Sequence, residues 1–120
     1  MDRELRKKLC LVAARRRTIT YGEVALPLGL DMGWPPDRDK IAEMLGEISA
    51  HEHAKGRPLV SAVVVLAESG WPGGGFFDLA RSTGRMAPHE DRVAYFAREL
   101  RTVHDYWAAR RKAKSTPGAP

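Results

Sequence analysis

Apolar residues recur at helical spacing in three segments of the chain. Residues 2–16, 37–54 and 88–111 each place an apolar side chain at every third or fourth position, with charged residues on the remaining circumference. The stripes are formed by Leu5, Leu9 and Val12, by Ile41, Met44, Leu45 and Ile48, and by Val93, Phe96, Leu100, Val103 and Trp107. The last stripe alternates steps of three and four, as a heptad seam does. The spacing therefore predicts three amphipathic helices, of which the last is the longest.

Shorter sequence patterns between these three segments predict additional helices and a strand. Thr20 and Glu23 have the spacing of a capping box, which predicts a short helix that stops at Gly29. A second brief helix is expected over about residues 76–83, before a glycine. Residues 59–66 form a short apolar run rich in β-branched side chains, which predicts a strand buried on both faces. One strand among several helices indicates a helix-rich α+β fold with a long C-terminal helix.

Length and composition narrow this picture. A chain of 120 residues with 43% hydrophobic and 29% charged residues is typical of one globular domain, expected here over residues 1–111. Residues 112–120 have the Lys, Ser, Pro and Gly content of a disordered basic tail. One cysteine excludes an intramolecular disulfide and a cysteine-based zinc site. No apolar run has the length of a membrane span or the position of a secretory signal, so we expect a cytoplasmic location and no membrane partner.

The net charge of +5 is concentrated at the two ends of the chain. Residues 1–17 hold seven Lys or Arg against two acids, and residues 108–120 hold four Lys or Arg and no acid. The body between them holds nine Lys or Arg against thirteen acids. If the ends meet in space they form one basic patch suited to nucleic acid, and otherwise they are two short arms. The alternative is that these charges serve solubility and complement the helix termini.

The order of helix, capped short helix, longer helix, strand and Gly-bearing turn is that of a winged helix-turn-helix. The segment Thr18-Ile19-Thr20-Tyr21-Gly22-Glu23-Val24-Ala25 resembles the "TTYGEVA" segment that opens the helix-turn-helix of the DNA alkyltransferase and alkyltransferase-like proteins. Arg57-Pro58, the apolar run, Ser69-Gly70 and Gly73-Gly74-Gly75 are similar in order to that family's Asn-Pro, active-site strand, wing turn and Gly-Gly. The resemblance covers about residues 18–80 and implies a winged-helix domain.

The reactive motif of that family has no counterpart here. The family carries Pro-Cys-His-Arg, or Pro-Trp-His-Arg in non-reactive relatives, where this chain has Val60-Ser61-Ala62-Val63-Val64. Cys10 lies outside the motif, and nothing in the sequence places beside it the base or positive pocket that a thiolate nucleophile needs. We therefore reject alkyl transfer and expect no enzymatic activity. Residues 56–65, 72–77 and 106–107 also resemble small bacterial proteins of winged-helix type, and that resemblance implies no activity.

Two aromatic or glycine-rich loops allow more than one interpretation. The backbone N–H groups of Gly73-Gly74-Gly75 can approach a phosphate, or the three glycines can form a tight loop that turns neighbouring aromatic side chains into the core. Trp34, in the Gly-Trp-Pro-Pro loop, can stack on a base or seat in a partner, or it can pack down as a lid.

The two histidines of the His51-Glu52-His53 segment are possible metal ligands by residue type, but their spacing argues against a metal site. On a helix these two imidazoles point about 200° apart, so they cannot share an ion without fraying the helix. We expect a solvated helix end there, with a Glu47–His51 pair, no metal and no cofactor.

The preferred hypothesis is a non-catalytic winged-helix protein that binds nucleic acid, with DNA favoured. The helix of residues 37–54 would face the major groove, although it carries more acids than bases. Binding is expected to depend on Arg15, Arg16, Arg17, Tyr21, Arg38, Lys40, Arg57, Arg110, Arg111 and Lys112. The alternative is a protein-interaction module on the same scaffold, favoured by the acidic helix and the Trp-bearing loops, in which the last helix supplies a dimer seam or packs on the first helix.

Overall fold

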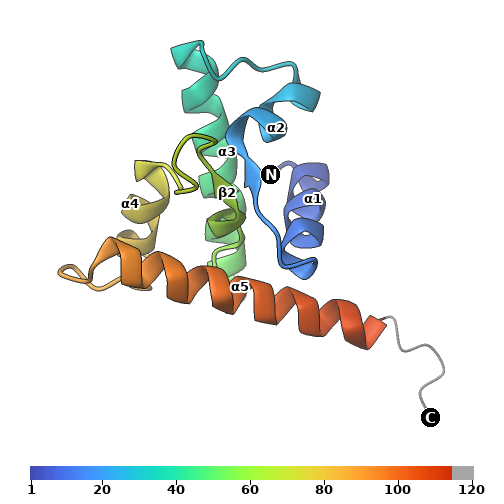
Figure 1. Ribbon diagram of the computed structural model, residues 1–120, viewed down its shortest axis with the longest axis vertical. Coiled ribbons are helices and arrows are strands. Elements are labelled where there is room, and N and C mark those ends of the chain that lie inside the picture. Colours follow the sequence, from blue (N-terminus) through green and yellow to red (C-terminus); the bar gives the residue numbers. More distant parts are fainter. Residues whose placement is uncertain (115–120) are drawn as a thin grey trace.

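The computed structural model describes residues 1–114 and confirms a helix-rich α+β class (Figure 1). In chain order the elements are α1 (Arg3–Ala14), β1 (Ile19–Thr20), α2 (Tyr21–Ala25), η1 (Leu26–Leu28), α3 (Pro35–Ala54), η2 (Val60–Val63), β2 (Val64–Val65), α4 (Gly74–Ser82) and α5 (Arg92–Lys114). The elements η1 and η2 are short 3-10 helices. Figure 1 shows α5 lying across one end of the molecule, with α1, α3 and α4 above it.

For the strand predicted over residues 59–66, the burial is confirmed for residues 59–65, whereas Leu66 is exposed and most of the backbone is not a strand. Only Val64 and Val65 form β2, which pairs in parallel with β1 so that Ile19 lies opposite Val64. Residues 60–63 form η2 instead, which packs against α1, α3 and α5. Because helices enclose this segment, its apolar side chains are buried without a longer strand ladder.

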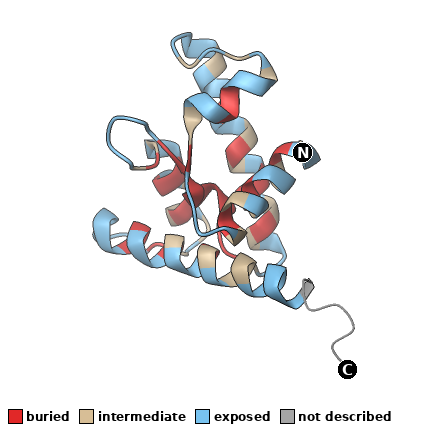
Figure 2. Cartoon of the chain, turned by 45° about the vertical axis from the view of Figure 1, so that its right-hand side comes forward, coloured by how far each residue is buried: buried red, intermediate tan, exposed pale blue. Residues whose placement is uncertain are grey.

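The core lies between the helices and the η2–β2 segment (Figure 2). Aromatic side chains join α4 to α5: Phe76 lies 5.9 Å from Tyr95 between ring centroids, and the half-buried Trp71 lies 5.3 Å from Phe96. Phe77 is buried beside them. The aromatic side chains therefore lie in the core, as the tight-loop interpretation expected, but Gly74 and Gly75 form the first turn of α4 and are not part of a loop.

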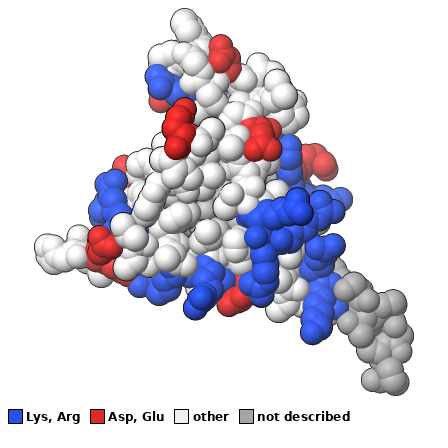
Figure 3. Space-filling model, in the orientation of Figure 1, with Lys and Arg blue, Asp and Glu red and all other residues white. Residues whose placement is uncertain are grey.

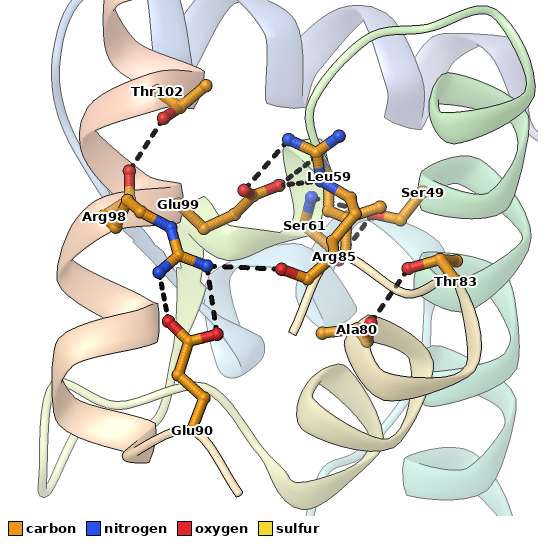
Figure 4. Close-up of polar contacts among 10 residues, drawn as sticks. All are labelled: Ser49, Leu59, Ser61, Ala80, Thr83, Arg85, Glu90, Arg98, Glu99 and Thr102. Carbon is orange, nitrogen blue, oxygen red and sulfur yellow. Dashed lines mark hydrogen bonds and ion pairs between the residues drawn. The ribbon is translucent and has the colours of Figure 1, made fainter. Parts of the chain in front are cut away.

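A buried carboxylate fastens α5 to the start of η2 (Figure 4). Glu99 accepts hydrogen bonds from the Leu59 N–H at 2.9 Å and from Arg85 Nε and Nη2 at 2.7 and 3.0 Å. On the α3 side, Ser49 Oγ accepts from the Ser61 N–H at 3.0 Å and shares a 2.6 Å hydrogen bond with Ser61 Oγ. The η2 segment is therefore held by polar bonds from two directions.

Two helix boundaries differ from the prediction for local reasons. The first helix ends at Ala14 because Arg16 adopts a left-handed backbone with φ 56°, and the Arg17 N–H then donates to the Val12 carbonyl at 3.1 Å. The third begins at Pro35, since proline is well suited to the first turn of a helix.

The last helix is displaced toward the C-terminus relative to the prediction. It begins at Arg92 and continues to Lys114, so residues 112–114 of the predicted tail are helical. Residues 115–120 lie outside the described part of the chain. Val93 is 56% exposed and does not join the apolar stripe, which α5 uses to pack on α1 and the core.

The capping box at the start of α2 is confirmed. Thr20 Oγ1 accepts from the Glu23 N–H at 3.1 Å, and the Thr20 N–H donates to Glu23 Oε1 at 3.2 Å. The helical segment stops at the predicted glycine, because Gly29 takes the left-handed conformation with φ 70°.

Replacing Thr20 by alanine removes the hydroxyl that accepts the Glu23 N–H. We expect Thr20→Ala to lower the free energy of unfolding by about 0.5–2 kcal/mol, measured by urea denaturation. Thr18→Ala is the matched control, because Thr18 is exposed and lies outside the cap. Equal stability of the two variants would contradict the role of the cap.

Candidate nucleic-acid interface

The two basic ends of the chain meet. Among the described residues, α1 and α5 make the most extensive contact of any two elements. The end of α1 is held against α5 by an ion pair between Arg16 Nη1 and Asp105 at 2.7 Å, and by a 2.9 Å hydrogen bond between His104 Nε2 and the Arg17 carbonyl. Figure 3 shows Lys and Arg gathered over this region, at the lower right of the view. We call it the basic surface, formed by Arg6, Lys7, Arg15, Arg16, Arg17, Arg57, Arg110 and Arg111.

A cleft of about 360 Å³ opens in the basic surface between α1 and α5. Its charged lining residues are Arg6, Lys7, Arg57, Arg110 and Arg111. Cys10 and Trp107 contribute to its wall, and no acidic residue of the described chain lines it. The cleft is therefore a concentration of positive charge on the surface.

Glu52 organises one side of this cleft. Its carboxylate is fully buried and accepts from Arg6 Nε and Nη2 at 2.9 and 3.2 Å and from Arg57 Nε and Nη2 at 2.9 and 2.9 Å. Burial alone would raise the pKa of Glu52, but the hydrogen bonds from Arg57 and Arg6 outweigh it and hold that pKa below its usual value. The expected solvated helix end is thus wrong, because Glu52 serves as the joint between α1, α3 and the segment after α3.

The predicted Glu47–His51 pair is also wrong. Glu47 lies 2.7 Å from the N-terminal amino group of Met1, and His51 Nε2 lies 3.9 Å from Glu52 Oε2. Within residues 1–114, no group of three or more His, Cys, Asp or Glu side chains could hold a metal ion.

Three of the predicted site residues line the cleft. Arg57, Arg110 and Arg111 face it, whereas Arg15, Arg16 and Arg17 lie at the adjoining end of α1. Lys112 is exposed on the last turns of α5. Arg57 does not offer its full charge to a ligand, because Glu52 binds it on one edge.

The remaining predicted residues belong to a different region. Tyr21 and Arg38 line a separate pocket of about 300 Å³ at the start of α4, and Lys40 is exposed on α3. Arg38 precedes Glu52 by fourteen positions, which separates them by about 21 Å along the helix axis. The predicted set therefore does not form one site, since α3 runs away from α5 toward the opposite end of the molecule (Figure 1).

Tyr21 has a structural role in that second pocket. Its hydroxyl accepts from the Gly73 N–H at 2.8 Å, and a Cβ at Gly73 would come within 3.1 Å of the same oxygen. A larger residue at position 73 would therefore make Tyr21 shift slightly, whereas glycine leaves room for the hydrogen bond as it stands.

The sequence did not predict a place at the cleft for Arg6, Lys7, Glu52 or Trp107. In a helical projection of α1, one side away from the main apolar stripe carries Arg6, Lys7, Cys10 and Ala14. On α5, Arg110 and Arg111 follow Trp107 by about one helical turn. These spacings are visible in the sequence, but the pairing of the two sides is not.

The surroundings of Cys10 and Trp34 bear on two further expectations from the sequence. Burial raises the pKa of the Cys10 thiol to about 11, which disfavours the thiolate that nucleophilic attack requires. Trp34 is 58% exposed, so the lid interpretation of its loop is wrong.

Comparison with protein-family models, with curated proteins and with solved structures found no match. Separately, no helix within residues 1–114 is long and apolar enough to cross a membrane.

The charged joint at Glu52 makes stability depend on pH. Because its folded pKa lies below the ordinary value of 4.5, its contribution is fully present above that value and is lost as the pH falls through the folded pKa. We expect Glu52→Gln to lower the free energy of unfolding at neutral pH by about 3–5 kcal/mol, since two guanidinium groups lose their buried partner.

The measurement is urea denaturation from neutral to acidic pH. Wild type should lose stability below pH 4.5, and Glu52→Gln should lose less over the same range. Glu47→Gln is the control, because the Glu47 carboxylate is exposed. A Glu52→Gln variant as stable as this control would contradict the assigned role.

Proposed function

We propose that this chain binds nucleic acid without catalysing a reaction on it, that DNA is the favoured form, and that the contact is made on the basic surface. The meeting of the two basic chain ends carries this proposal. Residues 1–17 hold seven Lys or Arg against two acids, and residues 92–114 hold seven against two. Dense positive charge of this kind binds the phosphate backbone by displacing its counterions.

The ion pairs indicate which cations are available to phosphate. Arg6 and Arg57 share Glu52, and Arg16 is paired with Asp105. The remaining members of the basic surface have no acidic partner within residues 1–114, namely Lys7, Arg15, Arg17, Arg110 and Arg111. These cations supply the electrostatic attraction that the proposal needs.

The winged helix-turn-helix is part of the same proposal. The order α1, β1, α2, α3, β2 supports this part of the proposal, and the turn after β2, closed by a 2.7 Å bond from the Leu66 N–H to the Trp71 carbonyl, would serve as the wing. The third helix is a poor match for phosphate, because it holds two basic residues against five acids. We therefore place nucleic acid on α1 and α5 rather than on α3.

A specific observation favours a second candidate, a protein-interaction module. Leu26 is 79% exposed and Trp34 is 58% exposed, and both belong to the connection between α2 and α3. Exposed large apolar side chains of this kind often mark protein contacts. A protein partner or a second copy of the chain would then dock at the end of the molecule opposite the basic surface.

The two functions separate in a titration of labelled duplex and single-stranded DNA, followed by fluorescence anisotropy at about 50 and 200 mM salt. A nucleic-acid binder must weaken steeply between these concentrations. Absence of binding at the lower salt concentration would reject the nucleic-acid function and favour the protein-interaction module.

Paired charge variants locate the interface. We expect Arg15→Gln/Arg17→Gln to weaken DNA binding more than Arg38→Gln/Lys40→Gln, although each pair removes two charges. The first pair should also reduce the salt slope by up to about two, since each phosphate that the protein no longer neutralises lowers the slope by ~0.9. If instead the Arg38/Lys40 pair abolishes binding and the Arg15/Arg17 pair retains it, the interface lies on α3.

A further inference from the structure

We propose that the cleft between α1 and α5 binds one phosphate group, so that a nucleic-acid strand is anchored by an inserted phosphate and not only held along an open surface. This inference rests on the proposed function and deepens it by naming the chemical group that the cleft takes. It is carried by the charge lining the cleft, by the fixed orientation of two of its guanidinium groups, and by its size.

Charge at the cleft is strongly unbalanced. Five cationic side chains line it, and within residues 1–114 the one carboxylate bound to them is that of Glu52, which lies fully buried behind Arg6 and Arg57. A phosphodiester carries one negative charge, and a terminal phosphate monoester carries about 1.5–2 at neutral pH. A terminal phosphate therefore compensates more of this excess charge than an internal one.

Glu52 prepares two of the cations before any ligand arrives. A guanidinium group has five N–H donors, and Arg6 and Arg57 each use two of them on Glu52. Three donors remain on each group, and both side chains line the cleft. Because their orientation is already fixed, binding an anion costs less side-chain entropy than it would with free arginines.

Aromatic contacts position another cation. The Arg110 guanidinium lies 5.4 Å from the Tyr106 ring centroid and 5.8 Å from that of Trp107, and Arg6 lies 5.6 Å from Trp107. Trp107 thus contacts arginines from both α1 and α5 and forms part of the wall of the cleft. Cation–π contacts keep Arg110 at this position without neutralising its charge.

The size of the cleft suits this ligand class. Its volume of about 360 Å³ lies at the lower end of the range for small-molecule pockets. Such a space accepts a phosphate with part of its nucleotide, whereas a rigid duplex can only lie over the opening. We therefore expect single-stranded ends to occupy the cleft better than blunt duplex DNA.

Cys10 provides a direct readout of occupancy, because it is the single cysteine of the chain and lines the cleft. Because burial raises the pKa of the Cys10 thiol to about 11, the experiment measures its slow alkylation by iodoacetamide at one fixed alkaline pH at which the protein stays folded, followed by mass spectrometry, with Cys10→Ser as the unlabelled blank. The probes are inorganic pyrophosphate and a short DNA strand with and without a 5′-phosphate, each at matched ionic strength. At ten times Kd we expect alkylation to slow about tenfold, and the phosphorylated strand to act at the lower concentration.

Two double variants separate the cleft from the surrounding surface. Lys7→Gln/Arg111→Gln removes two charges that line the cleft, and Arg15→Gln/Arg17→Gln removes two charges of the basic surface outside it. We expect the first pair to abolish protection of Cys10 by pyrophosphate and the preference for a 5′-phosphate. The second pair should weaken strand binding overall and retain both effects. Circular-dichroism melting checks that both variants are folded.

The outcomes distinguish this inference from the function on which it rests. Strand binding that leaves Cys10 alkylation unchanged, or protection of Cys10 that both double variants reduce equally, overturns the cleft site and leaves nucleic-acid binding intact. Protection by pyrophosphate without strand binding supports the phosphate site and rejects the nucleic-acid function. Equal protection by strands with and without a 5′-phosphate identifies an internal phosphodiester as the occupant, which supports the site.

Discussion

The buried carboxylate of Glu52 is the interaction on which the arrangement of this molecule depends. A charge removed from water must be matched by close partners, and Glu52 obtains them from Arg6 on α1 and from Arg57 after α3. Each arginine donates to both oxygens of the carboxylate, so Glu52 accepts four hydrogen bonds from these two side chains. These bonds fix the position of α1 beside the end of α3, and from there α1 packs along α5.

The same joint explains how basic residues far apart in the sequence come to share one surface. Once α1 lies on α5, Lys7 and Arg111 lie at one cleft although 104 positions separate them. The acids at the start of α3, Asp37 and Asp39, and the exposed Trp34 lie toward the other end of the molecule. The basic ends of the chain are thus brought together in space, and the proposal that the two ends of the molecule bind different partners rests on this arrangement.

A second buried carboxylate, that of Glu99, also links elements around the core. Glu99 binds the Leu59 N–H and Arg85, and so joins α5 to the entrance of η2 and to the connection after α4. Glu52 binds Arg57 just before η2 and Glu99 binds the Leu59 N–H at its start, so the most apolar run of the chain is held among helices. The burial of this run therefore does not require a large sheet, and β1 and β2 pair over only two residues each.

The sequence by itself determined the features that depend on neighbours within a few positions: the helical stripes, the Thr20–Glu23 cap, the stop at Gly29 and the burial of residues 59–65. Only the tertiary structure decided that η2 replaces most of the expected strand, that Trp34 is exposed, and that Tyr21 and Arg38 lie apart from the basic surface. The cleft belongs to the second group as well. Its Arg6–Glu52 bond joins residues 46 positions apart, and such a pairing is set by the packing of whole helices, which no local pattern of residues records.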